Sequence, residues 1–132
     1  MSRALVSLKR DVIRGTHVPL SKRGGSLHTG YFDGASKGNP GQAAIGCVIV
    51  SPEGRTIWEH SEAIGIATNN EAEYTALIRL LENARALGIV EIHIKGDSQL
   101  VINQVSGGWK INHDHLFVLC EEARTLLGKF KQ

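Results

Sequence analysis

Residues 68–98 decide the fold; they read TNNEAEYTALIRLLENARALGIVEIHIKGDS and pass from a helical pattern to a strand pattern. Apolar residues recur at steps of three and four up to Leu87, which predicts an amphipathic helix with N-cap candidates in residues 68–70 and a stop at Gly88. Residues 91–95 then alternate between charged or polar and apolar side chains, as a short strand does. A strand that follows a crossover helix pairs in parallel with an earlier strand, so this stretch predicts an α/β fold.

Three strands are expected before that helix. Residues 27–33 alternate with the period of a strand, and residues 34–41, where Gly and Pro fill four of eight positions, predict a loop. Residues 43–50 are apolar on both faces, as in a central strand. After a tight turn at residues 51–54, residues 55–64 are expected to form the returning strand of a hairpin.

Two further helices complete the expected architecture. One opens at Ser98, directly after the strand that ends at Asp97, and the last runs from about His115 to Leu127. The predicted fold class is therefore α/β: a mixed sheet made of an antiparallel three-strand meander plus a parallel strand, with helices packed on it. The parallel strand is expected to pair with the strand over residues 27–33.

Length and composition indicate one globular domain. The 132 residues are 42% apolar and 21% charged, which suffices to bury a core without disulfides. No run approaches the ~18 apolar residues of a membrane span, and no secretory signal pattern is seen. Cys47 and Cys120 lie in apolar contexts without metal-ligand spacing and are expected to be buried thiols. We therefore expect a protein of the cytoplasm that does not contact a membrane.

The positive charge is concentrated in residues 1–26. They hold six Lys or Arg and a single Asp, whereas residues 27–132 hold nine basic and twelve acidic residues. Because residues 22–26, KRGGS, are typical of a flexible linker, we expect a basic, flexible leader followed by one domain at residues 27–132. Attraction to phosphates and a targeting role are alternatives for the leader.

Three carboxylates are expected at one edge of the sheet. Asp33 and Asp97 end two strands that are predicted to be adjacent and parallel, and ligand sites in open α/β sheets lie at such ends. Glu73 heads the apolar stripe of the helix, where an unpaired charge would be costly. Like charges this close need a cation, and hard oxygen ligands favour Mg²⁺ or Mn²⁺ over Zn²⁺. The alternative is that each acid is an ordinary cap or surface residue.

Three blocks of the sequence resemble the signature motifs of type I ribonuclease H. They are FDGASKGNPG at residues 32–41, TNNEAEY at residues 68–74 and GDSQLV at residues 96–101. Their order and separation match those of the family, and the resemblance covers about residues 27–130. The short link GGWK at residues 107–110 is similar to that of the compact, archaeal-like branch.

The resemblance implies a metal-dependent endonuclease that hydrolyses the RNA strand of RNA–DNA hybrids, with two Mg²⁺ or Mn²⁺ ions when substrate is bound. Asp33, Glu73 and Asp97 would then be the catalytic residues and the metal ligands. The residues that the resemblance places against the nucleic acid are Ser36, Gly38, Asn39, Asn69, Asn70 and Gln99. Small polar groups can read the 2′-hydroxyl, which distinguishes RNA from DNA in a hybrid, without reading sequence.

The resemblance is incomplete at its C-terminal end. Family members continue with a fifth strand and a helix that carry a mobile His and a fourth carboxylate, and we expect both elements to be missing here. Asp114 fits a helix N-cap better than a replacement ligand. Asp11, the one acid of the leader, is a second candidate to replace the missing ligand. The strand that ends at Asp97 would then be a free sheet edge, open to a second copy of the chain or to a partner segment. Alternatively, the leader covers this edge, since its residues 4–8 and 12–13 are apolar enough to pack. Without the fourth acid, the alternative function is a catalytically impaired module that binds hybrids or double-stranded RNA.

Overall fold

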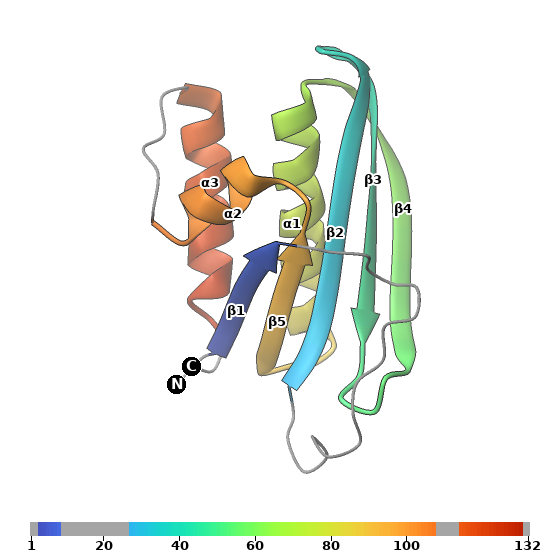
Figure 1. The fold of residues 1–132 in the computed structure, drawn as a ribbon, viewed down its shortest axis with the longest axis vertical. Helices are drawn as coiled ribbons and strands as arrows, with labels where there is room; N and C mark the ends of the chain where they lie inside the picture. Colours follow the sequence, from blue (N-terminus) through green and yellow to red (C-terminus); the bar gives the residue numbers. More distant parts are fainter. Residues whose placement is uncertain (1–2, 9–26, 108–113, 131–132) are drawn as a thin grey trace.

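The described residues form a five-stranded mixed sheet that is covered by helices (Figure 1). The structure is a computed structural model that describes residues 3–8, 27–107 and 114–130. The helices of this described part include none that is both long and apolar enough to cross a membrane. The strands are β1 (Arg3–Leu8), β2 (Leu27–Gly38), β3 (Gly41–Val50), β4 (Thr56–Ala67) and β5 (Glu91–Gly96), and the helices are α1 (Asn69–Ala86), α2 (Gln99–Val105) and α3 (Asp114–Leu127).

The sheet confirms the predicted combination of antiparallel and parallel pairing. Strands β2, β3 and β4 form the antiparallel meander, and β5 lies parallel to β2 on the other side of that strand. The parallel ladder ends where Phe32 pairs with Gly96. The connection from β4 to β5 runs through α1, as expected of a crossover helix.

The sheet edge beside β5 is covered by strand β1, whereas the sequence predicts a free edge there. Strand β1 runs parallel to β5 in a register from Arg3 opposite Glu91 to Leu8 opposite Gly96, so the strand order is β1-β5-β2-β3-β4. The expectation of a free edge is therefore wrong, and so is the assignment of residues 3–8 to a flexible leader; the alternative that the leader covers this edge is confirmed for residues 3–8. A short apolar run beside basic residues is ambiguous as a strand signal. Residues 9–26 lie outside the described part of the chain.

The first hairpin is longer than predicted. Residues 34–38 continue β2, and pairing with β3 extends to Gly38 opposite Gly41, so the predicted loop over residues 34–41 is reduced to a turn at Asn39 and Pro40. Gly38 has a φ of +81°, which suits a glycine at the end of the strand. The glycines of residues 34–41 predict a loop, but the hydrogen-bonded ladder between β2 and β3 continues through them.

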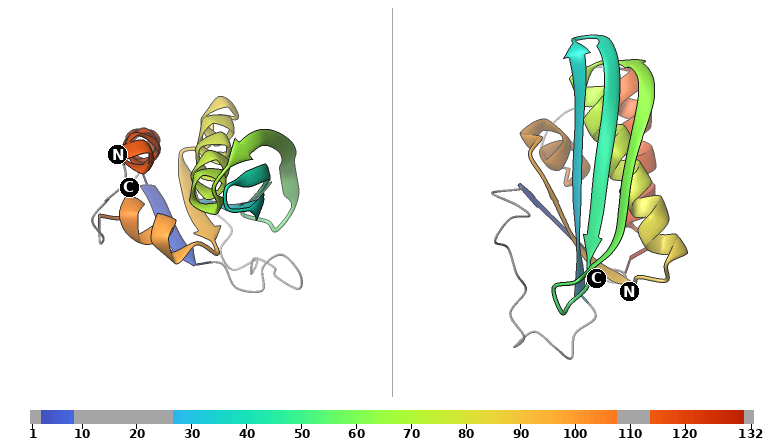
Figure 2. Two further views of the ribbon diagram at one scale, coloured as in Figure 1. Left: turned by 90° about the horizontal axis from the view of Figure 1, so that it is seen from above. Right: turned by 90° about the vertical axis from the view of Figure 1, so that its right-hand side faces the viewer.

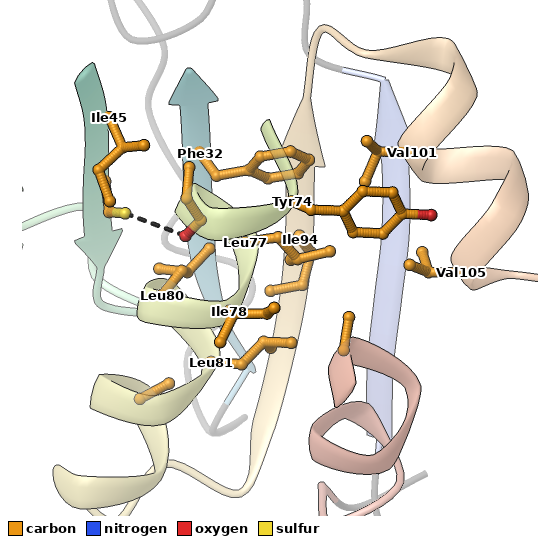
Figure 3. Packing of buried hydrophobic residues seen from close by; sticks show 14 of the residues in the cluster. Phe32, Ile45, Tyr74, Leu77, Ile78, Leu80, Leu81, Ile94, Val101 and Val105 are labelled. Carbon is orange, nitrogen blue, oxygen red and sulfur yellow. Dashed lines mark hydrogen bonds between the residues drawn. The ribbon is translucent and has the colours of Figure 1, made fainter. Parts of the chain in front are cut away.

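The apolar core lies between the sheet and the longer helices. Figure 2 shows α1 and α3 side by side on one face of the sheet. Leu77, Leu80 and Ala84 of the predicted stripe are fully buried, and Figure 3 shows the two leucines among the packed side chains. Leu87 is 50% exposed because α1 already ends at Ala86. Gly88, with a φ of +81°, follows that end as the sequence predicted.

Removal of residues 1–8 is expected to lower the Tm by about 5 °C or more and to promote self-association. The reason is that β5 would then present a row of unpaired N–H and C=O groups. Thermal denaturation and sedimentation velocity measure both effects, and removal of residues 1–2 alone, which precede β1, is the control. An unchanged Tm and a monomer after removal of residues 1–8 would contradict the role assigned to β1.

Candidate active site

Two of the predicted carboxylates lie side by side, directly beyond the end of the parallel ladder between β2 and β5. Asp33 lies within β2, and Asp97 directly follows β5. Because Phe32 pairs with Gly96, Asp33 and Asp97 are the next residues on two neighbouring strands. Both acids are exposed, so solvent and a ligand can reach them.

Glu73 reaches the same place through the backbone of Gly34. The N–H of Gly34 donates a hydrogen bond to Oε1 of Glu73 at 3.0 Å. A Cβ atom at Gly34 would lie 2.5 Å from the C and O atoms of Ala72, so only glycine lets β2 approach the start of α1 this closely. A hydrogen bond to an ionised carboxylate is stronger than a neutral one and orients the group. This contact explains how a carboxylate can head an apolar helix stripe.

The start of α1, which carries Glu73, is fixed by a capping box. Oγ1 of Thr68 accepts from the N–H of Glu71 at 3.1 Å, and Oε1 of Glu71 accepts from the N–H of Thr68 at 2.8 Å. Two otherwise unpaired donors of the helix end are thereby satisfied. The predicted N-cap is confirmed at Thr68, and Glu71 serves the cap.

The three carboxylates are brought to neighbouring segments but are not drawn together as a finished metal cluster. Within residues 3–8, 27–107 and 114–130, no three His, Cys, Asp or Glu side chains form a group that could hold a metal ion. Asp33 and Asp97 are exposed and Glu73 is half-buried. The donor set itself, three hard carboxylate oxygens with Glu73 oriented by a backbone N–H, fits a divalent cation such as Mg²⁺.

A second cluster joins the tip of the first hairpin to the start of α1. Oδ1 of Asn39 accepts from the N–H of Asn69 at 2.9 Å, and Oδ1 of Asn69 accepts from the N–H of Ser36 at 2.8 Å. Because only the oxygen of an amide can accept, these contacts set the orientation of both side chains, and each amide nitrogen is left as the donor toward a ligand. Both asparagines are exposed.

Ser36 has a different part in this cluster from the one that the resemblance implies. Its Oγ lies 2.5 Å from the carbonyl oxygen of Gly38 and 2.8 Å from that of Ala67, so its single proton is used within the protein. Its N–H is also used, by Asn69. In this structure Ser36 therefore fastens the hairpin to the end of β4.

The remaining predicted contact residues lie around the same edge. Asn70 is half-buried at the start of α1, and Gln99 is exposed as the first residue of α2. Ser98 caps α2 by accepting from the N–H of Val101 at 3.2 Å, which fixes the point where the chain turns after Asp97.

Two residues near the site were not singled out from the sequence. The hydroxyl of Tyr74 donates to Oε1 of Gln104 at 2.5 Å, and both residues are buried. Burial raises the pKa of Tyr74, so its hydroxyl remains a donor at neutral pH. Gln104 lies among the apolar residues of α2, and a polar residue in an apolar stripe was the signal that could have found it.

The cysteines behave as the sequence predicts. Cys47 and Cys120 are both free and buried. The Sγ of Cys47 donates to the carbonyl oxygen of Ala76 at 3.2 Å, and burial raises the pKa of the Cys47 thiol to about 12. Such a thiol is not a nucleophile at neutral pH.

Comparison with known proteins identifies the family. A family model described as "Reverse transcriptase-like" matches residues 31–132. The crystal structure of ribonuclease H1 from the halophilic archaeon Halobacterium salinarum is 49% identical in sequence; the match covers 79% of this chain and 79% of that one, with a TM-score of 0.77. The chain belongs to the type I ribonuclease H family. The family and the mixed-sheet fold predicted from the sequence are thereby confirmed.

Other members of the ribonuclease H family show the same likeness. The structure of LC11 ribonuclease H1 in complex with an RNA/DNA hybrid is 34% identical, with coverage of 79% of this chain and 81% of that one and a TM-score of 0.73. The curated ribonuclease HI of Halobacterium salinarum is 50% identical over 115 residues, which are 87% of this chain and 57% of that relative. The chain thus spans little more than half the length of that curated relative.

Two expectations about a replacement ligand fall on residues that the structure does not describe in full. Asp11 lies outside the described part of the chain. Helix α3 begins at Asp114, close to the predicted start, but the surroundings of the Asp114 side chain lie outside what is described. Both assignments stay predictions.

Proposed function

We propose that this chain is a divalent-metal-dependent endonuclease that hydrolyses the RNA strand of RNA–DNA hybrids. The observation that carries the proposal is the placement of Asp33, Glu73 and Asp97 on neighbouring segments, with Glu73 oriented by the N–H of Gly34. Membership of the type I ribonuclease H family supports it. The relative solved with an RNA/DNA hybrid supports the choice of substrate.

Asp33, Glu73 and Asp97 would hold two Mg²⁺ or Mn²⁺ ions when substrate is bound. Bound ions of this kind activate a water for attack on phosphorus and stabilise the leaving oxygen. The residues of the chain supply the negative charge that gathers these cations beside the scissile phosphate. The N–H of Gly34 keeps one Glu73 oxygen in place, so this carboxylate does not have to be ordered during the reaction.

The cluster at the hairpin tip would orient the nucleic acid. The amide nitrogens of Asn39 and Asn69 are donors for a 2′-hydroxyl or a phosphate oxygen, while their oxygens are held by backbone N–H groups. Asn70, at the start of α1, and Gln99, at the start of α2, would add donors, and Gly38 would let the backbone approach the RNA. Ser36 would act by holding this hairpin to β4. The free, buried cysteines suit the reducing cytoplasm, where we place the activity.

The test is cleavage of a short hybrid whose RNA strand is labelled. We expect cleavage of RNA with Mg²⁺ or with Mn²⁺, none in the presence of a chelator, and none of the DNA strand or of a DNA duplex. Absence of cleavage with both ions would overturn the proposal. Retained binding of the hybrid in that case would instead favour the alternative, a module that binds hybrids without cutting them.

A further inference from the structure

A buried hydrogen bond joins α1 to α2 behind the candidate active site. The hydroxyl of Tyr74 donates to Oε1 of Gln104 at 2.5 Å; Tyr74 is fully buried and Gln104 is 3% exposed. In Figure 3 the ring of Tyr74 extends from α1 toward α2, near Val101 and Val105. Such a bond is shielded from water, so breaking it costs more than breaking an exposed one.

The two partners belong to the helix that carries Glu73 and to the helix that begins just after Asp97. Tyr74 is the residue after Glu73 in α1. Gln104 lies in α2, whose N-cap, Ser98, is the residue after Asp97. The bond therefore connects the helix that carries one carboxylate with the helix that receives the chain directly after the other.

Other contacts fix the carboxylates only in part. Pairing of β2 with β5 sets Asp33 against Asp97, and the N–H of Gly34 sets Glu73 against Asp33. Helix α2 has only seven residues, and its N-cap, Ser98, accepts from the N–H of Val101 within the helix itself. The C-terminal part of α2 is held by Gln104, whose main-chain carbonyl oxygen accepts from Nη2 of Arg124 in α3 at 2.6 Å.

We propose that Tyr74 and Gln104 are a positioning pair that sets the separation between Glu73 and Asp97. The inference rests on the proposed function of this site. Neither residue reaches the substrate, because both are buried; they act through α1, which carries Glu73, and α2, which begins just after Asp97. Helix α2 also buries Val101, Ile102 and Val105, so it stays packed when the bond is removed. The separation between Glu73 and Asp97 is then no longer fixed. Displacements of about 1 Å at a reacting site cost up to roughly a hundredfold in rate.

The test compares Tyr74→Phe, Gln104→Met and the double variant. We expect kcat to fall by about tenfold and the Mn²⁺ concentration for half-maximal activity to rise by about fivefold, with KM for the hybrid within about twofold. The double variant should be no worse than Tyr74→Phe, because the hydroxyl of Tyr74, which also interacts with Cys120, is already lost there and Gln104→Met removes no further part of the bond. Additive losses in the double variant would overturn the inference.

The matched control is Cys47→Ala. Cys47 also donates a buried hydrogen bond to α1, at the carbonyl oxygen of Ala76, but it links α1 to β3 and not to α2. A merely structural role for Tyr74 predicts that Tyr74→Phe and Cys47→Ala change the Tm and the Mn²⁺ dependence alike. The positioning role predicts that only Tyr74→Phe shifts the Mn²⁺ dependence.

Direct Mn²⁺ binding, measured by calorimetry without substrate, separates this inference from the proposed function. If the unmodified chain binds Mn²⁺ but does not cleave hybrids, the proposed function fails. The role of Tyr74 and Gln104 is then tested by the Mn²⁺ affinity of the variants alone. Weaker Mn²⁺ binding by Tyr74→Phe than by Cys47→Ala then supports the pair, and equal binding overturns it. Absence of Mn²⁺ binding by the unmodified chain overturns both.

Discussion

Glu73→Gln is expected to lower the rate of hybrid cleavage by roughly a thousandfold while the protein remains folded and still binds the hybrid. The glutamine keeps an oxygen that can accept from the N–H of Gly34, so the contact between α1 and β2 survives. What is lost is the negative charge, and with it the attraction for a divalent cation. Single-turnover cleavage, hybrid binding and the Tm measure the three quantities.

Glu71→Gln is the matched control for that substitution. Glu71 lies on the same turn of α1, and its replacement by glutamine makes the same change of charge. Its Oε1 accepts from the N–H of Thr68 in the capping box, and a glutamine oxygen can accept the same hydrogen bond. We expect cleavage within about threefold of the unmodified rate, because this carboxylate is not aimed at the site. Equal losses in the two variants would show that the rate follows the net charge of the helix end, and would remove Glu73 from its catalytic role.

Gly34→Ala is expected to lower the rate by roughly a hundredfold, and stability by about 1–3 kcal/mol. The added methyl group would lie 2.5 Å from the backbone of Ala72 and 2.8 Å from the N atom of Glu73, so β2 and α1 must move apart. The separation displaces Asp33 from Glu73 and lengthens the bond from the N–H of Gly34. Cleavage kinetics and chemical denaturation report the two effects.

Gly46→Ala provides the control within the same sheet. Gly46 pairs with Asp33 across β2 and β3, and a Cβ atom there would meet only the carbonyl oxygen of His60, at 3.9 Å. We expect stability to change by less than ~1 kcal/mol, because the new side chain has space and the unfolded chain loses freedom. If Gly46→Ala were as damaging as Gly34→Ala, a general intolerance of the sheet to alanine would explain both, and the close approach of β2 to α1 would not.

Local pattern predicted most of the elements that carry the site. Residues 68–98 combine helix period, a cap and a strand, and the structure has α1, its cap at Thr68 and β5 in those places. The adjacency of Asp33 and Asp97 followed from connectivity, because a crossover helix makes the flanking strands parallel. The position of Glu73 followed from its place at the head of the apolar stripe.

What could not be predicted depends on contacts between segments far apart in the sequence. The bond from Gly34 to Glu73, the pair formed by Tyr74 and Gln104, and the pairing of β1 with β5 all join such segments. Period and composition indicate which face of a helix or strand is apolar, but they do not indicate which other segment packs against that face. The glycines in residues 34–41 misled for the same reason, since their close packing against α1 and the opposite strand is invisible locally.

The place of β1 also has a consequence for the order of folding. Its residues are synthesised before those of the other strands, yet they pair with residues 91–96, which lie 88 positions further along the chain. Closing so long a loop costs more entropy than forming the hairpins of β2 to β4, so the meander and α1 can assemble before this contact exists. Of the strands of this sheet, β1 is therefore expected to be made first and to join last, and until it docks, the edge next to Asp97 stays open to competing strands.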